Sequence, residues 1–366
     1  MALSVHIKKK LKDFRLAVDF DMDEGIVGFL GSSGCGKSMT LKCIAGIEIP
    51  DEGRIVLDGE VLFDKKAGIN LLPQKRKVGY LFQNYALFPH MTVRQNIEAG
   101  LTASNKTKQR KKEIVEQLLE QFHIKELENS YPIRISGGQQ QRAALARMMA
   151  AEPQFLLLDE PFSALDAYLK EKLMQEMMTY LNQFKKGVIM VSHSRDEVYQ
   201  MCSNTVIMHR GTLETVGKTR DIFDNPRTVN AARLTGCKNI SQATKTGDHE
   251  VYASDWDVKL TFPKQTEISS NLTHVGIRAH EIRPVVSRDT ELKDVGTNES
   301  IKLNTMDCQL DHISEAPFEM YLILKNKNGK STSPLWWKVT KKEWKEIGET
   351  VPGTVELPAE HIILLK

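Results

Sequence analysis

The 366-residue sequence predicts an α/β domain with a helical subdomain, followed by a smaller, mostly β domain. Over residues 1–235, short and almost wholly apolar runs alternate with helix-forming segments, which is typical of a parallel sheet covered on both faces. Residues 87–151 instead carry apolar side chains at helical spacing, so we expect a helical insert there. Residues 238–366 contain short strand-like runs separated by Asn, Gly, Ser and Pro, which predicts the second domain.

The composition and net charge of the chain indicate which broad classes of protein it can belong to. Hydrophobic residues make up 41% of the chain and charged residues 27%, which is ordinary for a soluble globular protein of about two domains. The formal net charge of +3 is too small to indicate a surface for nucleic acid or anionic lipid. Five cysteines without metal-type spacing predict reduced thiols in a cytoplasmic protein. Nowhere do about 18 apolar residues run uninterrupted, so we expect no membrane-spanning helix.

The elements of the first domain follow from the spacing of its apolar residues. Strands are predicted over residues 14–20, 26–30, 78–82, 155–158 and 188–191. Helices are predicted over residues 39–45 and 166–184, and the second of these connects two strands as a β-α-β crossover. Residues 50–53 predict a turn, and Asp58-Gly59 predicts a hairpin between two short strands.

A glycine-rich loop between the strand 26–30 and the helix 39–45 fits the pattern G-x-x-x-x-G-K-[ST]. Its residues are Gly31, Ser32, Ser33, Gly34, Cys35, Gly36, Lys37 and Ser38. The glycines allow several backbone N–H groups to point at one anion, and the start of the helix adds the positive end of its dipole. Lys37 can then reach the β- and γ-phosphates of a nucleotide, and the Ser38 hydroxyl can bind the accompanying Mg²⁺. The loop therefore predicts nucleotide binding.

Two carboxylates end the apolar run 155–158. Asp159 and Glu160 follow that run, so we expect them at the edge of the sheet where the glycine-rich loop also lies. Asp159 is suited to hold Mg²⁺, and Glu160 is suited to polarise the water that attacks the γ-phosphate. The alternative is that the acid pair merely begins a surface loop, and the glycine-rich loop upstream argues against it.

A helix start between these two features completes the pattern. Ser136 is a suitable N-cap, while Gly137 and Gly138 leave backbone N–H groups open to an anion, and Gln139 follows them. A capped helix start is common by itself, so its place between the glycine-rich loop and the acid pair decides the interpretation. In this order the three features resemble the ATP-binding cassette family, and the resemblance covers residues 1–235.

The resemblance implies a P-loop NTPase core and a role for each matching segment. Residues 31–38 match the ATP-binding Walker A loop, and Gln83 matches the Q-loop. Asp159 and Glu160 match the Walker B aspartate and the catalytic glutamate, and His193 matches the switch histidine. By this resemblance, ATP hydrolysis depends on Glu160, His193, Lys37 and Gln83. The ligands of Mg²⁺ are expected to be Ser38, Gln83 and Asp159.

Further segments extend the resemblance. Residues 135–139 match the family signature, with Ile135 where Leu is usual, and residues 136–139 of it are expected to contact ATP bound to a second copy. Residues 163–166, which end in Asp166, match the D-loop. The family also has an aromatic residue near the N-terminus that stacks on adenine. Phe14 is the candidate for this role, although its place in an apolar alternation agrees equally with a core role. Met39, directly after the Walker A loop, is expected to contact ATP.

The resemblance also implies partners. The signature of one copy closes on the ATP held by the Walker A loop of another, so one set of motifs per chain implies a homodimer with two ATP molecules. Hydrolysis of the γ-phosphate would let this dimer open. Residues 84–92 look like the importer segment that contacts transmembrane permease subunits. We therefore expect the chain at the cytoplasmic face of the membrane, linked indirectly to a solute-binding protein, with no nucleic acid as partner.

The second domain resembles the regulatory β domain of one importer branch, which is OB-like and of MOP or TOBE type. Residues 275–282 are similar to its G-I-R-P-E segment, with Ala279 in place of Pro and His280 in place of Glu. The opening segment 11–20 looks most like that of molybdate and tungstate importers, which implies oxyanion import, with sulfate as a further candidate. Iron, sugars and polyamines are the alternative cargoes. The sequence does not identify the residues that would bind a regulatory oxyanion.

Two other classes of protein share parts of this pattern. A soluble ATPase of the same fold that acts on nucleic acid usually carries two cassettes or a long coiled coil, and this chain has neither, nor a basic stripe. A regulatory module that binds nucleotide without hydrolysing it would lack Glu160 or His193, and both are present. The sequence therefore favours an ATPase that drives transport.

Overall fold

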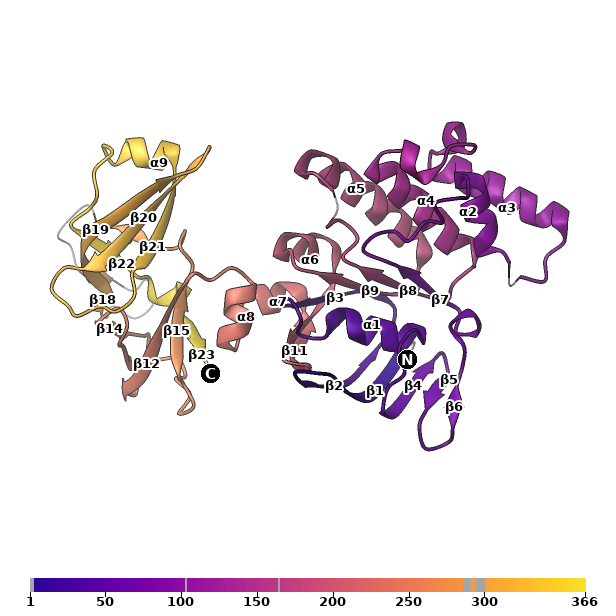
Figure 1. The fold of residues 1–366 in the computed structure, drawn as a ribbon. Coiled ribbons are helices and arrows are strands. Elements are labelled where there is room, and N and C mark those ends of the chain that lie inside the picture. Colours follow the sequence, from indigo (N-terminus) through magenta and orange to yellow (C-terminus); the bar gives the residue numbers. More distant parts are fainter. Residues whose placement is uncertain (1–2, 103, 164, 286–290, 294–299) are drawn as a thin grey trace. The chain divides into compact units, whose positions relative to one another are not determined.

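The computed structural model of the chain divides into two compact units, Met1–Arg220 and Asp221–Lys366. The structure describes residues 3–102, 104–163, 165–285, 291–293 and 300–366. Figure 1 shows the first unit in indigo to magenta and the second in orange to yellow. Each unit has its own hydrophobic core.

A mixed sheet forms the centre of the first unit. Its strands are β1 (Leu3–Lys10), β2 (Arg15–Met22), β3 (Gly25–Gly31), β4 (Glu52–Leu57), β5 (Glu60–Asp64), β6 (Ile69–Asn70), β7 (Val78–Leu81), β8 (Phe155–Asp159), β9 (Gly187–Ser192), β10 (Asn204–His209) and β11 (Thr212–Lys218). They lie in the order β6-β5-β4-β1-β2-β11-β10-β3-β9-β8-β7. The run from β10 to β7 is parallel, and β8 and β9 are buried along their whole length. The predicted α/β core is therefore confirmed.

The helices of the first unit cover the sheet and form the insert. They are α1 (Lys37–Ala45), α2 (Val93–Gly100), α3 (Lys108–Gln121), α4 (Gly137–Ala150), α5 (Ala167–Phe184) and α6 (Arg195–Met201). Short 3-10 turns occupy Pro73–Lys75, Lys125–Leu127 and Pro132–Arg134. Helix α5 connects β8 and β9, which are parallel neighbours, so the predicted crossover is confirmed. Helices α2, α3 and α4 all lie between β7 and β8 in the chain and pack together (Figure 1).

The predicted turn over residues 50–53 is wrong in its second half, because strand β4 begins at Glu52. Gly53 pairs with Ile7 of β1 and has a φ of +105°. A Cβ on Gly53 would lie 1.9 Å from the carbonyl oxygen of His6, so the two strands approach too closely for a side chain here. Glycine therefore marks a close strand contact instead of a chain reversal. Strand β1 itself was not predicted, although its residues alternate between buried and more exposed positions over much of its length.

The second unit is rich in β structure, as predicted. Its strands are β12 (Asn239–Gly247), β13 (Glu250–Ala253), β14 (Val258–Thr261), β15 (His274–Ile277), β16 (Arg283–Pro284), β17 (Glu291–Lys293), β18 (Ser300–Lys302), β19 (Thr305–Glu315), β20 (Glu319–Asn326), β21 (Leu335–Thr340), β22 (Thr354–Glu356) and β23 (Ile363–Leu365). Two five-stranded sheets have the orders β14-β13-β12-β15-β23 and β16-β22-β19-β20-β21. Trp256 and Trp337 are each 1% exposed in the core that they share.

Short helices accompany these sheets. They are α7 (Thr219–Asp224), which crosses the boundary between the units, α8 (Val229–Leu234) and α9 (Lys341–Glu346), with a 3-10 turn at Ala359–His361. All five cysteines of the chain are buried and free, as expected for reduced thiols. Within the ranges that the structure describes, no helix combines the length and the apolar character needed to cross a membrane.

Candidate active site

The glycine-rich loop connects β3 to α1 at the carboxyl edge of the parallel strands. Gly34 and Gly36 have φ of +76° and +111°, a left-handed conformation that glycine adopts without steric penalty. Ser32 and Ser33 are exposed at the outside of the loop, whereas Cys35 is buried beneath it. The left-handed glycines therefore allow the tight turn that connects β3 to α1.

The start of α1 is ready to receive an anion. The helix begins at Lys37, two residues before the predicted Met39, and in the described structure no side chain caps its first N–H groups. Such free donors lie at the positive end of the helix dipole. Lys37 is only 4% exposed, and its Nζ donates to the carbonyl oxygens of Gly31 and Ser32 at 2.8 and 2.9 Å. Since no described carboxylate pairs with this buried cation, an anionic ligand would supply the missing counter-charge.

A buried carboxylate lies next to the loop. Asp159 ends β8 and is 6% exposed. Its Oδ1 accepts a hydrogen bond from the Ser38 hydroxyl at 2.7 Å, and its Oδ2 accepts one from the Tyr80 hydroxyl at 2.8 Å. Burial, and then the neighbouring Asp159 carboxylate, raises the pKa of Tyr80, so the phenol is the donor. The structure thus brings the predicted Ser38 and Asp159 together and adds Tyr80, which no motif indicated.

Glu160 is held between two side chains from the neighbouring strands. Nε2 of Gln83 donates to Oε2 of Glu160 at 3.0 Å, and Nε2 of His193 pairs with Oε1. Glu160 has a φ of +49°, which is uncommon for a residue with a side chain, and its N–H donates to the carbonyl oxygen of Val191. These residues follow the ends of β7, β8 and β9, so adjacent parallel strands converge on one carboxylate.

The signature segment makes mainly local contacts in the single chain. Ser136 and Gln139 form a capping box at the start of α4, so the predicted N-cap is confirmed. Gly138 is buried against α5, where an added Cβ would lie 2.9 Å from a methyl carbon of Leu173. Asp166 likewise caps α5, because its side chain accepts the N–H of Leu169 at 2.9 Å. Ala164 of the predicted D-loop lies outside the described residues.

Phe14 lies beside the glycine-rich loop. A Cβ on Gly36 would be 3.5 Å from Cε2 of Phe14, and a Cβ on Gly211 would be 2.7 Å from its Cδ2. The residue is half-buried, so part of the ring remains accessible. This place suits stacking on a base bound at the loop, which stays a prediction. Met39 is also partly buried and packs against the core of the first unit.

The segment between β7 and α2 is attached to the helix that carries the signature. Tyr85 and Ala86 have φ of +59° and +46°, and their carbonyl oxygens accept hydrogen bonds from the Arg147 guanidinium of α4 at 2.9 and 2.7 Å. Phe88 and Met91 expose 47% and 38% of their surfaces. The segment therefore combines a fixed backbone with accessible apolar side chains. Sequence reasoning did not find Arg147, because its partners are backbone atoms distant in the chain.

Comparisons with known proteins agree with this arrangement. A family model described as ABC transporter matches residues 16–163. The sulfate/thiosulfate import ATP-binding protein of Synechococcus elongatus is 38% identical over 237 residues, which are 64% of this chain and 67% of that protein. The molybdate/tungstate import ATP-binding protein of Pyrococcus horikoshii is 38% identical over 280 residues, 75% of this chain and 77% of the relative. The spermidine/putrescine import ATP-binding protein of Oleidesulfovibrio alaskensis is 37% identical over 251 residues, 68% of this chain and 66% of the relative.

Solved structures give the same assignment. An ATP-binding cassette dimer in a post-hydrolysis state, bound to ADP and phosphate, is similar with a TM-score of 0.51 and 26% identity. The match covers 60% of this chain and 99% of that chain. The α/β core, the nucleotide loop and the related sequences together place this chain in the ABC transporter family, among its ATP-binding subunits.

Proposed function

We propose that this chain is the ATPase subunit of an importer, which hydrolyses ATP to ADP and phosphate and drives uptake of a small solute through separate membrane subunits. The observation that carries the proposal is the Glu160 carboxylate, held by Gln83 and His193 beside a glycine-rich loop with a buried lysine that pairs with no described carboxylate. The relatives named as import ATP-binding proteins support the transport role.

We assign nucleotide binding to the glycine-rich loop and its surroundings. Lys37 and the free N–H groups of α1 would bind the phosphates, while Phe14 would stack on adenine. Ser38 and Asp159 would bind Mg²⁺, with Gln83 nearby; the 2.7 Å contact between the serine and aspartate oxygens supports this pairing. Oxygen ligands with a single carboxylate fit Mg²⁺, which completes its shell with water and nucleotide phosphates. Bound Mg²⁺ supplies positive charge at the β- and γ-phosphates.

Hydrolysis requires a base and stabilisation of the transferred phosphoryl group. Glu160 is the proposed base and would accept a proton from the attacking water. Gln83 and His193 contact different oxygens of its carboxylate, so they would fix its orientation toward that water. Lys37 would stabilise the negative charge of the γ-phosphate in the transition state.

The proposed role of the signature segment, residues 136–139, requires a second copy of the chain. Ser136 and Gln139 bond to each other, and Gly137 and Gly138 begin α4, so N–H groups of this helix start could face a nucleotide held elsewhere. In a homodimer, that nucleotide would be the ATP of the partner, with Asp166 near the interface. The similar cassettes solved as dimers support this assembly. Closure with ATP and opening after hydrolysis would then provide movement.

The segment 84–92 is the proposed contact with the membrane subunits. Its exposed Phe88 and Met91 supply apolar surface, and its backbone is tied to α4 through Arg147. The chain would act at the cytoplasmic face of the membrane, and a solute-binding protein would act through the membrane subunits. For the cargo we favour an oxyanion, as in the sulfate and molybdate/tungstate relatives, and the spermidine/putrescine relative makes a polyamine the second candidate.

Magnesium-dependent ATP turnover by the purified chain tests the central claim. We expect slow turnover by the parent, a loss of about 10²- to 10⁴-fold for Glu160→Gln, and accumulation of an ATP-bound dimer. Glu171→Gln, which makes the same change at an exposed position of α5, is the matched control. Equal turnover by Glu160→Gln and the parent would show that Glu160 is not the base. Stimulation by nucleic acid, measured in the same assay, would favour the rival class of soluble ATPases.

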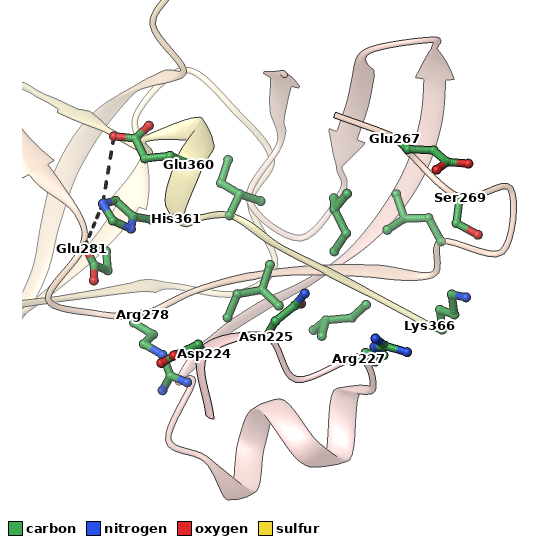
Figure 2. A pocket seen from close by; sticks show the side chains of 15 residues that line it. Asp224, Asn225, Arg227, Glu267, Ser269, Arg278, Glu281, Glu360, His361 and Lys366 are labelled. Carbon is green, nitrogen blue, oxygen red and sulfur yellow. Dashed lines mark ion pairs between the residues drawn. The ribbon is translucent and has the colours of Figure 1, made fainter. Parts of the chain in front are cut away.

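The second unit is proposed as a regulatory domain of the OB-like, MOP or TOBE type. It contains a cavity of about 670 Å³ lined by the segment after α7, the segment before β15 and residues 360–366 (Figure 2). Arg227, Ser269 and Lys366 lie toward one end of this cavity in the figure, where Glu267 also lies near Ser269. Neither cation pairs with a carboxylate among the described residues, so we propose this end as the binding place of a regulatory oxyanion.

The melting temperature of the full chain, measured with molybdate, tungstate or sulfate, tests this regulatory role. A ligand that binds only the folded state raises the melting temperature. We expect a rise in the parent and none in Arg227→Gln/Lys366→Gln. The control Lys327→Gln/Lys345→Gln makes the same charge change at exposed positions of the same unit and should retain the rise. A rise that persists in the first double variant would exclude this cavity as the anion site.

A further inference from the structure

A hydrogen bond from β7 fixes the carboxylate that lies next to Ser38. Strands β7 and β8 are parallel, with Tyr80 opposite Leu157, so these two side chains lie on the same face of the sheet. Asp159 lies two residues beyond Leu157 and returns to that face. The long Tyr80 side chain spans this offset, and its hydroxyl donates to Oδ2 of Asp159 at 2.8 Å.

Each oxygen of the Asp159 carboxylate has its own donor. Ser38 donates to Oδ1 at 2.7 Å, and Tyr80 donates to Oδ2 at 2.8 Å. Ser38 belongs to α1 and Tyr80 belongs to β7, so the two donors are held by separate elements. Together their hydrogen bonds oppose rotation of the carboxylate about its Cβ–Cγ bond. The Tyr80 ring is itself held against Phe82, with ring centroids 4.4 Å apart.

We infer that Tyr80 is a positioning residue for the metal of the hydrolysis reaction. It acts through Asp159, which it orients toward the place where Ser38 and the carboxylate would share Mg²⁺. This inference rests on the proposed magnesium site. With Mg²⁺ bound, Ser38 would present an oxygen lone pair to the metal, and the Tyr80 hydrogen bond would keep the Asp159 carboxylate in place.

If Tyr80 positions Asp159, loss of its hydroxyl should weaken Mg²⁺ binding and leave metal-free nucleotide binding unchanged. Tyr80→Phe keeps the ring and removes only the hydroxyl, so the carboxylate loses one of its two donors. Partners of this kind change metal affinity by about 10- to 100-fold when they are removed. Nucleotide binding without metal depends on the glycine-rich loop and Lys37, which Tyr80→Phe does not alter.

The test measures binding of a fluorescent ATP analogue to the full chain as Mg²⁺ is titrated, so its readout is independent of turnover. For Tyr80→Phe we expect the half-saturating Mg²⁺ concentration to rise about tenfold, with unchanged affinity for the analogue in EDTA. Tyr180→Phe is the matched control, because it also removes one hydroxyl hydrogen bond, to the carbonyl oxygen of Gln121 at 3.1 Å. Tyr80→Met provides a second variant that lacks the hydroxyl and keeps an apolar side chain.

Asp159→Asn separates failure of this inference from failure of the magnesium site. If Asp159→Asn raises the Mg²⁺ requirement while Tyr80→Phe and Tyr80→Met behave like Tyr180→Phe, the metal site stands and the role of Tyr80 is refuted. If Asp159→Asn also leaves the Mg²⁺ requirement unchanged, the proposed metal site itself is wrong. Equal weakening of analogue binding with and without metal in the Tyr80 variants would show a purely structural role, which also overturns the inference.

Discussion

The nucleotide site of the first unit differs from the end of the second unit's cavity that Glu281, Glu360 and His361 line, because the ionisable groups of that end contact one another. In the first, the buried Lys37 has no carboxylate partner among the described residues. At that end of the cavity, Nε2 of His361 lies 3.2 Å from Oε2 of Glu281 and 4.0 Å from Oε1 of Glu360. Ionisable groups that contact one another mainly hold the structure, whereas an uncompensated buried charge indicates a ligand. The buried charge of Lys37, which no described carboxylate balances, therefore distinguishes the nucleotide site from this end of the cavity.

Removal of the Lys37 cation is expected to have the largest effect on ATP binding. Lys37→Met should weaken ATP binding about 10- to 100-fold, because hydrogen bonds to charged groups contribute about 1.5–3 kcal/mol. Equilibrium binding of a fluorescent ATP analogue gives the measurement. His361→Gln changes a cavity residue that contacts Glu281, and this variant should bind the analogue like the parent. Similar losses in both variants would contradict the contrast between the two regions.

Gly137 and Gly138 of the signature test whether a glycine needed for packing can be distinguished from a neighbouring glycine that is not, within the first unit. A Cβ on Gly138 would lie 2.9 Å from Leu173 and 3.2 Å from Leu169. A Cβ on Gly137 would come within 4 Å of Leu165 alone among the described residues, at 3.6 Å. Gly138→Ala should therefore destabilise the first unit by about 1–3 kcal/mol through overpacking. Gly137→Ala should leave stability close to that of the parent. Urea unfolding followed by far-UV circular dichroism distinguishes them, and equal stabilities would argue against the packing role of Gly138.

The smallest expected effect is a pH dependence confined to the second unit. Burial lowers the pKa of His280, although Glu281 acts in the opposite direction. A lowered pKa means that the unfolded chain binds the proton more readily, so stability should fall as the pH drops below the usual histidine value of about 6.5 and level off below the folded-state pKa. The effect should be small because 57% of the side chain is exposed.

All four tryptophans of the chain lie in the second unit, so their fluorescence reports its unfolding directly. Urea unfolding measured in this way at pH 7 and pH 5 should show a smaller pH dependence for His280→Gln than for the parent. An unchanged pH dependence would assign the effect to other groups of the unit. Lys341→Gln alters an exposed ion pair of the same unit and serves as the control.

The contacts of the nucleotide site could largely be anticipated, because each candidate lies in a short contiguous motif at a strand end. The meeting of Ser38 with Asp159, and of Gln83 with Glu160, follows once adjacent strands are parallel. Tyr80 could not be found in this way. A tyrosine in an apolar strand is usually a core residue, and only the register with β8 reveals that its hydroxyl reaches Asp159.

In the fold, too, elements defined by contiguous residues were predicted, whereas features that depend on contacts between distant segments were not. Strands β3, β8 and β9 were predictable, because buried parallel strands are continuous apolar runs. The turn expected at Gly53 was wrong in part, since that glycine serves a close approach to β1, which is distant in the chain. The cavity of the second unit could not be predicted either, because it joins the segment after α7 to residues 360–366.

Helix α4 connects the segment proposed to contact the ATP of a second copy with the segment proposed to contact the membrane subunits. Ser136 caps its first turn, and Arg147 lies in its last turn, so the two residues are about 16 Å apart along the axis at 1.5 Å per residue. A regular helix of this length is stiff, and the Arg147 guanidinium attaches its far end to the carbonyl oxygens of Tyr85 and Ala86. A displacement of the first turn of α4 would therefore also move the segment that carries the exposed Phe88, because Arg147 bonds to the backbone of that segment.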